Sequence, residues 1–190
     1  MATRCREFQK SDTIYTGYGT AEIKLMEAAL EERIRYEEAR YNGKGKGGGS
    51  LWHHLVLVAR LAENLGRSEG LDPVTCRLAG LFHDAGKFSG GTYHQDDRPE
   101  EERSIELLLE LADKHGLDRD IVDRIVVSLQ QRYRNVEDQA PLTRVLFDAD
   151  NLDKLGFLGI TNYFIRSKSA MFSGVPEFTV IPSIWLKSQS

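Results

Sequence analysis

Helix-length segments separated by glycine, proline and aspartate dominate this sequence of 190 residues. In the segment 20–41, apolar residues recur three or four positions apart, at Ile23, Met26, Leu30 and Ile34. This spacing places them on one face of an α-helix, while charged residues fill the other faces. Because the same pattern returns along most of the chain, the sequence predicts an all-α fold with little β structure.

Turn-forming residues set the expected bounds of the helices. Asp72 offers an N-cap carboxylate, and Pro73 then occupies the first helical position. Pro99 is followed by three glutamates, which suit the positive end of a helix dipole. The expected helices span residues 20–41, 51–65, 71–86, 99–116, 118–130 and 141–156, with a further helix at 159–168. The glycine-rich segment 42–50 predicts a connecting loop. It is not a phosphate-binding loop, because the required Gly-Lys-Ser/Thr sequence after four intervening residues is missing.

The last twenty residues differ from the rest of the chain. Phe178, Val180 and Ile181 form a short β-like run, which Pro176 and Pro182 interrupt. We expect residues 171–190 to form an extended C-terminal arm that lies either on the body of the domain or on a neighbouring subunit, so a homodimer is one alternative. No internal repeat divides the chain, and we expect residues 1–190 to form a single domain.

Composition excludes several classes of protein. The net charge of −4 gives no reason to expect general affinity for nucleic acid, since a polyanion is normally met by a basic face. Two cysteines, Cys5 and Cys76, are too few for a disulfide framework, which favours a cytoplasmic protein. We expect no membrane segment, because the longest apolar run is far shorter than the roughly 20 residues that a membrane-spanning helix needs.

A histidine and an aspartate stand side by side in the segment LFHDAGK, residues 81–87. Neighbouring side chains on a helix point about 100° apart, so His83 and Asp84 can reach one ion only near the end of the helix. Gly86 is suited to a left-handed cap that would form this end. Imidazole and carboxylate together suit a divalent manganese, iron, cobalt, nickel or zinc ion.

Two other segments carry unusual polar residues. His54 shares a helical face with apolar residues such as Val58, and a buried imidazole needs either a hydrogen-bonding partner or a metal ion. Asp148, Asp150 and Asp153 crowd into one predicted helix, where their charges repel one another. Either the helix exposes these aspartates to solvent or a cation neutralises them.

The order His54, His83, Asp84 and Asp150 resembles the HD-domain superfamily of metal-dependent phosphohydrolases. Three signatures carry the resemblance over residues 50–157: HLVLVA at 54–59, HDAGK at 83–87 and DADNLD at 148–153. It implies a bundle of five or more helices, in agreement with the pattern of turns. It also implies that these four residues are the metal ligands, Asp150 being the aspartate of the family's Ala-Asp-x-Leu pattern.

Members of this superfamily cleave phosphate esters, very often in nucleotides. The resemblance therefore implies a small phosphorylated substrate, most often a nucleotide, and a divalent Mn, Fe, Co, Ni, Zn or Mg ion that polarises a phosphoryl oxygen and activates water. We expect one ion, because the segment 118–130 has no histidine. Hydrolysis of mono-, di- and triphosphate esters all remain alternatives. A rival hypothesis is a degenerate HD module that binds metal or nucleotide in a regulatory role, and the intact ligand set argues against it.

Three residues are candidates for catalysis. Asp84, as a metal ligand, is expected to hold and aim the attacking group. Lys87 would neutralise charge on the phosphate, although an ordinary surface lysine explains it equally well. Asp153 is either an acceptor that supports a ligand or a base.

Three further residues are candidates for substrate binding. Arg132 and Arg134 would grip phosphates with two parallel hydrogen bonds, the alternative being a solvated helix end. His94 lies in the glycine-containing segment 88–99, which leaves directly from the His83-Asp84 pair. We expect it to contact a base or phosphate or to reach a second ion, the alternative being a surface loop.

Overall fold

The computed structural model describes residues 20–42, 50–92, 98–132 and 138–155. In these ranges the chain forms six α-helices, one short 3-10 helix and no strand, which confirms the all-α prediction. The elements are α1 (Thr20–Asn42), α2 (Leu51–Ser68), α3 (Pro73–Phe82), η1 (Ser89–Gly91), α4 (Glu100–His115), α5 (Arg119–Gln131) and α6 (Pro141–Leu155).

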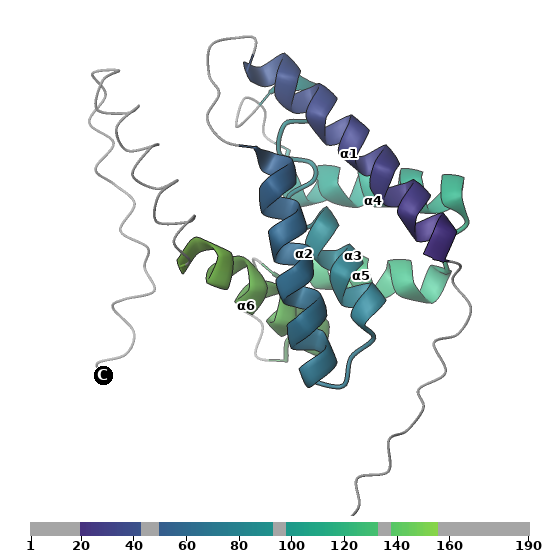
Figure 1. The fold of residues 1–190 in the computed structure, drawn as a ribbon, viewed down its shortest axis with the longest axis vertical. Coiled ribbons are helices and arrows are strands. Elements are labelled where there is room, and N and C mark those ends of the chain that lie inside the picture. The colour runs from purple at the N-terminus through teal and green to yellow at the C-terminus, as the bar shows by residue number, and fades with distance from the viewer. Residues whose placement is uncertain (1–19, 43–49, 93–97, 133–137, 156–190) are drawn as a thin grey trace, which may run out of the picture.

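Helices α2 and α3 form the centre of the bundle and pack closely along each other. Helix α1 lies together with α4 on one side, and α6 packs against α2 on the other (Figure 1). Helix α5 contacts α3, α4 and α6. As a result, the end of α3 lies where several helices can contribute side chains.

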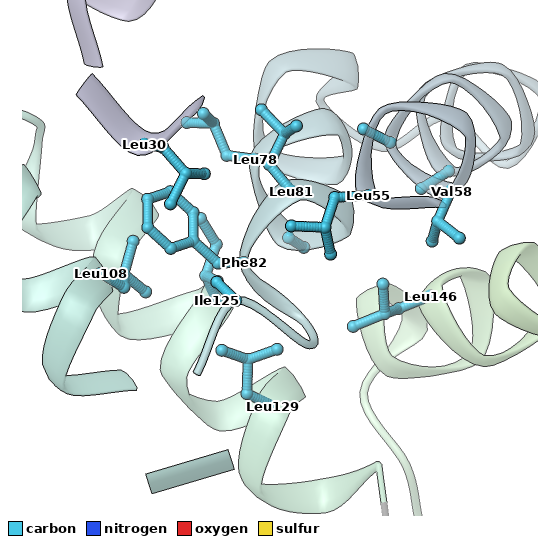
Figure 2. Packing of buried hydrophobic residues seen from close by; sticks show 14 of the residues in the cluster. Leu30, Leu55, Val58, Leu78, Leu81, Phe82, Leu108, Ile125, Leu129 and Leu146 are labelled. Carbon is cyan, nitrogen blue, oxygen red and sulfur yellow. The ribbon is translucent and has the colours of Figure 1, made fainter. Parts of the chain in front are cut away.

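The core fills the space between these helices. Met26, Leu30 and Ile34 of α1 are buried, as their helical spacing predicts. Phe82, the last residue of α3, is fully buried, and its ring points toward Leu30 of α1 and Leu108 of α4 (Figure 2). The residue that ends α3 is thus held firmly by the core, and the next two residues are His83 and Asp84.

Two predicted helix ends are wrong, and both involve glycine. Helix α2 continues past Gly66 to Ser68. Gly66 does not end the helix; its missing side chain makes room for Cys76, whose Sγ would lie 2.3 Å from an added Cβ. Helix α3 stops at Phe82, well before Gly86. Gly86 is not among the glycines with positive φ, so it forms no left-handed cap.

The absence of a side chain at Gly86 serves close packing. An added Cβ would lie 2.5 Å from Cβ of Arg103 and 2.6 Å from the backbone nitrogen of Ser104, both in α4. The backbone N–H of Gly86 donates to Oγ of Ser104 over 2.9 Å. Residues 83–88 therefore form a sequence of turns pressed against α4.

Several predictions fall on parts of the chain that are not described. They are the loop at 43–49, the helix at 159–168 and the C-terminal arm at 171–190. None of the described helices has the length and apolar character needed to cross a membrane.

Candidate metal centre

The site lies where α2, the turns after α3, and α6 meet. His54 belongs to the first turn of α2, whose start is fixed by α1: Oε1 of Glu38 accepts a hydrogen bond from the backbone nitrogen of Leu51 over 2.8 Å. His83 and Asp84 directly follow α3, and Asp150 lies in the last turns of α6. Three separate segments therefore bring these side chains together.

The Nε2 atoms of the two histidines lie close together, and each aspartate places one oxygen near both of them. Nε2 of His54 lies 3.1 Å from Nε2 of His83. Oδ2 of Asp84 lies 3.8 Å from Nε2 of His54 and 3.7 Å from Nε2 of His83. Oδ1 of Asp150 lies 3.6 and 3.7 Å from the same two nitrogens. Two ligands of one ion, each about 2.1 Å from it, would be about 3.0–3.5 Å apart, so the space between these atoms has nearly the size of a single ion.

Hydrogen bonds at the far side of each imidazole assign its tautomer. Nδ1 of His83 donates to the backbone oxygen of Gly80 over 2.7 Å. Nδ1 of His54 donates to Oδ2 of Asp153, also over 2.7 Å. A neutral imidazole with its proton on Nδ1 carries a lone pair on Nε2. Both lone pairs therefore point into the space between the rings, as metal-bound histidines require.

A carboxylate oxygen in the same space has no hydrogen-bonding partner among the described residues. Oδ1 of Asp150 is buried and accepts no hydrogen bond from the described residues. Because a buried, unpaired carboxylate oxygen is costly, such an atom calls for an ion or water. His54, His83 and Asp150 form a group whose ligand atoms lie within 4.8 Å of one another. The residues present therefore fit a divalent metal ion.

Three cations surround the two aspartates. Arg132 donates to Oδ1 of Asp84 over 3.1 Å and also pairs with Oδ2 of Asp150. Lys87 donates to Oδ2 of Asp84 over 3.3 Å, and Lys154 to Oδ2 of Asp150 over 2.6 Å. These contacts explain how two carboxylates remain ionised so close together.

The pKa values of the aspartates reflect this balance. Burial opposes the ionisation of Asp84, but the neighbouring imidazoles of His83 and His54 and the charges of Lys87 and Arg132 outweigh it and hold the pKa well below its usual range. For Asp150, burial is likewise outweighed, by His83, Arg132 and Lys154, so the pKa is again lowered. Both groups are thus available as anionic ligands near neutral pH.

His54 responds to the same negative charges. Burial disfavours its protonated form, yet its hydrogen bond to Asp153 and the nearby negative charges of Asp84 and Asp150 raise its pKa. A proton on Nε2 would turn the contact with His83 into a hydrogen bond, and a metal ion would accept both lone pairs instead. The space is therefore built to attract a positive charge.

The other candidate residues are at the site, on another face of α6, or outside the described residues. Asp153, Arg132 and Lys87 contact candidate ligands directly, and Lys87 lies at the edge of the site with its side chain 19% exposed. Asp148 is exposed, on a different face of α6 from buried Asp150. His94 and Arg134 lie outside the described residues.

Sequence reasoning did not single out Lys154 or the backbone oxygen of Gly80. The position of Lys154, four residues after Asp150, was an available signal, because side chains at this spacing meet on a helix. The carbonyl of Gly80 carries no signal in the sequence, since any residue type offers a backbone oxygen.

The site lies within a region that matches a known protein family. The family model for the HD domain matches residues 51–155, which contain all the ligand candidates and more than half of the chain. No curated protein and no solved structure matches the chain significantly. Members of the matched family are generally hydrolases that bind divalent metals. On the evidence of this match, the chain belongs to the HD-domain family.

Proposed function

We propose that this protein is a metal-dependent phosphohydrolase that cleaves a phosphate ester of a small molecule, with a nucleotide as the preferred substrate class. The observation that carries the proposal is the pair of imidazole lone pairs beside the unpaired Oδ1 of Asp150. Together with Oδ2 of Asp84 they form a donor set of two nitrogens and two oxygens, which suits a divalent ion of intermediate softness.

His54, His83, Asp84 and Asp150 would hold this ion. The chemistry that a divalent ion supplies in such a site is Lewis acidity, which polarises a phosphoryl oxygen and makes water nucleophilic at neutral pH. The protein supplies the geometry. The outer hydrogen bonds of His54 and His83 fix the rings, so that little reorganisation is needed when the site is loaded.

The charges around the site favour an anionic substrate. Among the described residues, the carboxylates of Asp84 and Asp150 contact three cations, and Asp153 contacts His54. The three carboxylates and the three cations together carry no net formal charge. A divalent ion added to this formally neutral group leaves an excess of positive charge, which would attract a phosphate.

Lys87 is the best candidate among the described residues for contact with that phosphate. Its Nζ lies beside Oδ2 of Asp84, the oxygen that faces the histidines, and its side chain is accessible from solvent. From there it would stabilise the charge that builds up on the phosphoryl oxygens. We propose that His94 and Arg134 also contact the substrate.

Asp153 would act through His54. Its Oδ2 accepts the Nδ1 proton, which keeps the ring in the tautomer that presents Nε2 to the metal. A carboxylate in this position also raises the basicity of the imidazole as a ligand. This contact favours the supporting role of Asp153 over the role of a base.

A metal-by-substrate screen tests the proposal. The protein is stripped of ions, reloaded separately with Mn²⁺, Fe²⁺, Co²⁺, Ni²⁺, Zn²⁺ or Mg²⁺, and assayed for phosphate release. The panel contains nucleoside mono-, di- and triphosphates, cyclic nucleotides and a simple aryl phosphate. We expect hydrolysis of at least one nucleotide with at least one metal.

A pair of variants from one helix sharpens the screen. Asp150→Ala removes the buried ligand, and we expect it to abolish metal binding and turnover together. Asp148→Ala removes an exposed carboxylate two residues away and should leave both unchanged. A wild type that binds metal tightly but hydrolyses nothing on the panel would favour the regulatory HD module. A wild type that binds no metal would contradict the phosphohydrolase and leave only a regulatory module that binds nucleotide.

A further inference from the structure

Arg132 connects the two aspartates from the side opposite the histidines. It directly follows α5 and is buried, with 8% of its surface exposed. Nη1 donates to Oδ1 of Asp84 over 3.1 Å, and Nη2 pairs with Oδ2 of Asp150. One guanidinium therefore joins carboxylates from two different elements, the turns after α3 and helix α6.

The oxygens that Arg132 contacts differ from the oxygens that face the histidines. Arg132 uses Oδ1 of Asp84 and Oδ2 of Asp150, whereas Oδ2 of Asp84 and Oδ1 of Asp150 lie within 3.6–3.8 Å of the two Nε2 atoms. Each carboxylate thus gives one oxygen to Arg132 and directs the other toward the metal space. Rotation of either carboxylate would break its bond to the guanidinium.

The planar fork of arginine is needed for this arrangement. Its N–H groups diverge at fixed angles, so one side chain can hold two carboxylates in a defined relative orientation. A lysine in the same place offers the same charge at a single point and cannot fix both groups. Lys154 illustrates the difference, because among the described residues it pairs with Asp150 alone, and its side chain is 61% exposed.

The same contacts bear on the number of ions. In a two-metal site, a bridging carboxylate gives one oxygen to each ion. Here the outer oxygens of Asp84 and Asp150 are held by Arg132, and that of Asp150 also by Lys154. A second divalent ion at these oxygens would have to displace a buried cation.

We infer that Arg132 is a positioning residue, which orients Asp84 and Asp150 toward a single divalent ion and keeps their outer oxygens from a second one. This inference rests on the proposed function, since it assumes that the site binds metal. It assigns Arg132 a role through the metal ligands, in place of the contact with the substrate phosphate that the sequence suggested.

Titration of the metal-free protein with Mn²⁺, followed by electron paramagnetic resonance, tests the inference without any substrate. The variant is Arg132→Lys, which keeps the charge and removes the fork. The matched control is Lys154→Gln, which removes a cation from the same oxygen of Asp150 without touching Asp84. Thermal unfolding of the metal-free proteins shows whether each variant folds.

We expect one Mn²⁺ per chain in the wild type. Arg132→Lys should bind it about tenfold more weakly, as is typical when a partner that orients a metal ligand is lost. Lys154→Gln should change the affinity less than about threefold, because the Lys154 side chain is 61% exposed and solvent screens its charge. KM and kcat of Arg132→Lys at saturating metal provide a further readout, and we expect KM to be unchanged.

Unchanged Mn²⁺ affinity in folded Arg132→Lys, with a raised KM, would overturn the inference and return Arg132 to the substrate. Two spin-coupled Mn²⁺ ions in the wild type would also overturn it, and this measurement does not depend on whether the variant folds. A wild type that binds no Mn²⁺, Zn²⁺ or Co²⁺ would instead contradict the proposed function.

Discussion

Two buried ionisable groups lie near opposite ends of α3 and behave in opposite ways. Cys76, near the start of the helix, is fully buried, and this burial, together with the negative charge of Asp72, raises the pKa of its thiol to about 11. Asp84, just beyond the end of the helix, is also buried, yet its pKa is lowered. Burial alone favours the neutral form, so the charged state of Asp84 shows how strongly its neighbours oppose that tendency.

The side chains around Cys76 are largely apolar, whereas those around Asp84 are polar or charged. Near Cys76 lies a pocket of about 330 Å³ that is lined largely by apolar side chains, among them Leu71, Val127 and Leu142. Around Asp84 lie two histidines, an arginine and a lysine. We therefore expect substitutions near the start of α3 to change stability alone, and substitutions near its end to change metal binding as well.

Replacement of Phe82 with alanine should have the largest effect on stability. Phe82 lies between Cys76 and Asp84 in the sequence, immediately before His83, and its ring is fully buried. We expect a loss of about 3–5 kcal/mol in the free energy of unfolding, measured with urea. Phe147→Ala is the control, because Phe147 is 43% exposed and its loss should cost less than about 0.5 kcal/mol. Similar losses in both variants would contradict this description of the core.

Much of the fold could be predicted from the sequence because helices follow local rules. The stripe of Met26, Leu30 and Ile34 depends only on a period of 3.6 residues, and all three are buried. The ends of α4, at Pro99 and Gly116, depend on the caps next to them, and Gly116 has the expected positive φ of 69°. The ends assigned to Gly66 and Gly86 were wrong because distant segments decide them.

The ligand candidates could be predicted for a different reason. A metal site requires particular residue types, and three short motifs contain them in order. The contacts of Arg132 could not be predicted in the same way, because it lies 48 residues from Asp84 and 18 from Asp150 in the chain. Pairs between elements leave no periodic signal, so only the packing of α3, α5 and α6 reveals them.

Gly80→Ala tests the packing that brings the two histidines together. An added Cβ would lie 2.5 Å from Cα and 2.8 Å from the backbone nitrogen of Ala59 in α2. Because backbone atoms cannot rotate away, α2 and α3 must separate, at a cost of about 1–3 kcal/mol in stability. The displacement moves His83 away from His54, so we also expect weaker metal binding by calorimetry.

Gly66→Ala is the matched control for this prediction. It overpacks the same pair of helices at the other end, against the thiol of Cys76. Stability should fall by a similar amount, while metal affinity should stay within about threefold of the wild type, since ligand distances at the far end change little. Equal losses of metal affinity in both variants would mean that the two ends are not independent.

Asp153→Asn tests the outer hydrogen bond of the site. The amide keeps the size of the side chain but removes the negative charge of the carboxylate, whose Oδ2 accepts the hydrogen bond from Nδ1 of His54. We expect metal affinity to fall about tenfold, equivalent to about 1.4 kcal/mol of binding free energy. Asp148→Asn makes the same change at an exposed position of α6 and should have no effect. If Asp153 were instead a base, turnover would fall while metal affinity stayed constant.

The smallest effect should come from the thiol of Cys76, and it depends on pH. The folded chain raises the pKa of this thiol from an ordinary value of 9.0 to about 11. In the unfolded chain the thiol therefore ionises first, so its contribution to stability is complete below pH 9 and is lost as the pH rises toward 11. We expect the stability difference between the wild type and Cys76→Ala to decrease by about 1 kcal/mol between pH 9 and pH 10. Other groups that titrate there are present in both proteins and cancel in the difference, which is measured by urea unfolding at several pH values. A difference that stays constant from pH 8 to 11 would mean that burial does not keep this thiol neutral, and the contrast with Asp84 would be lost.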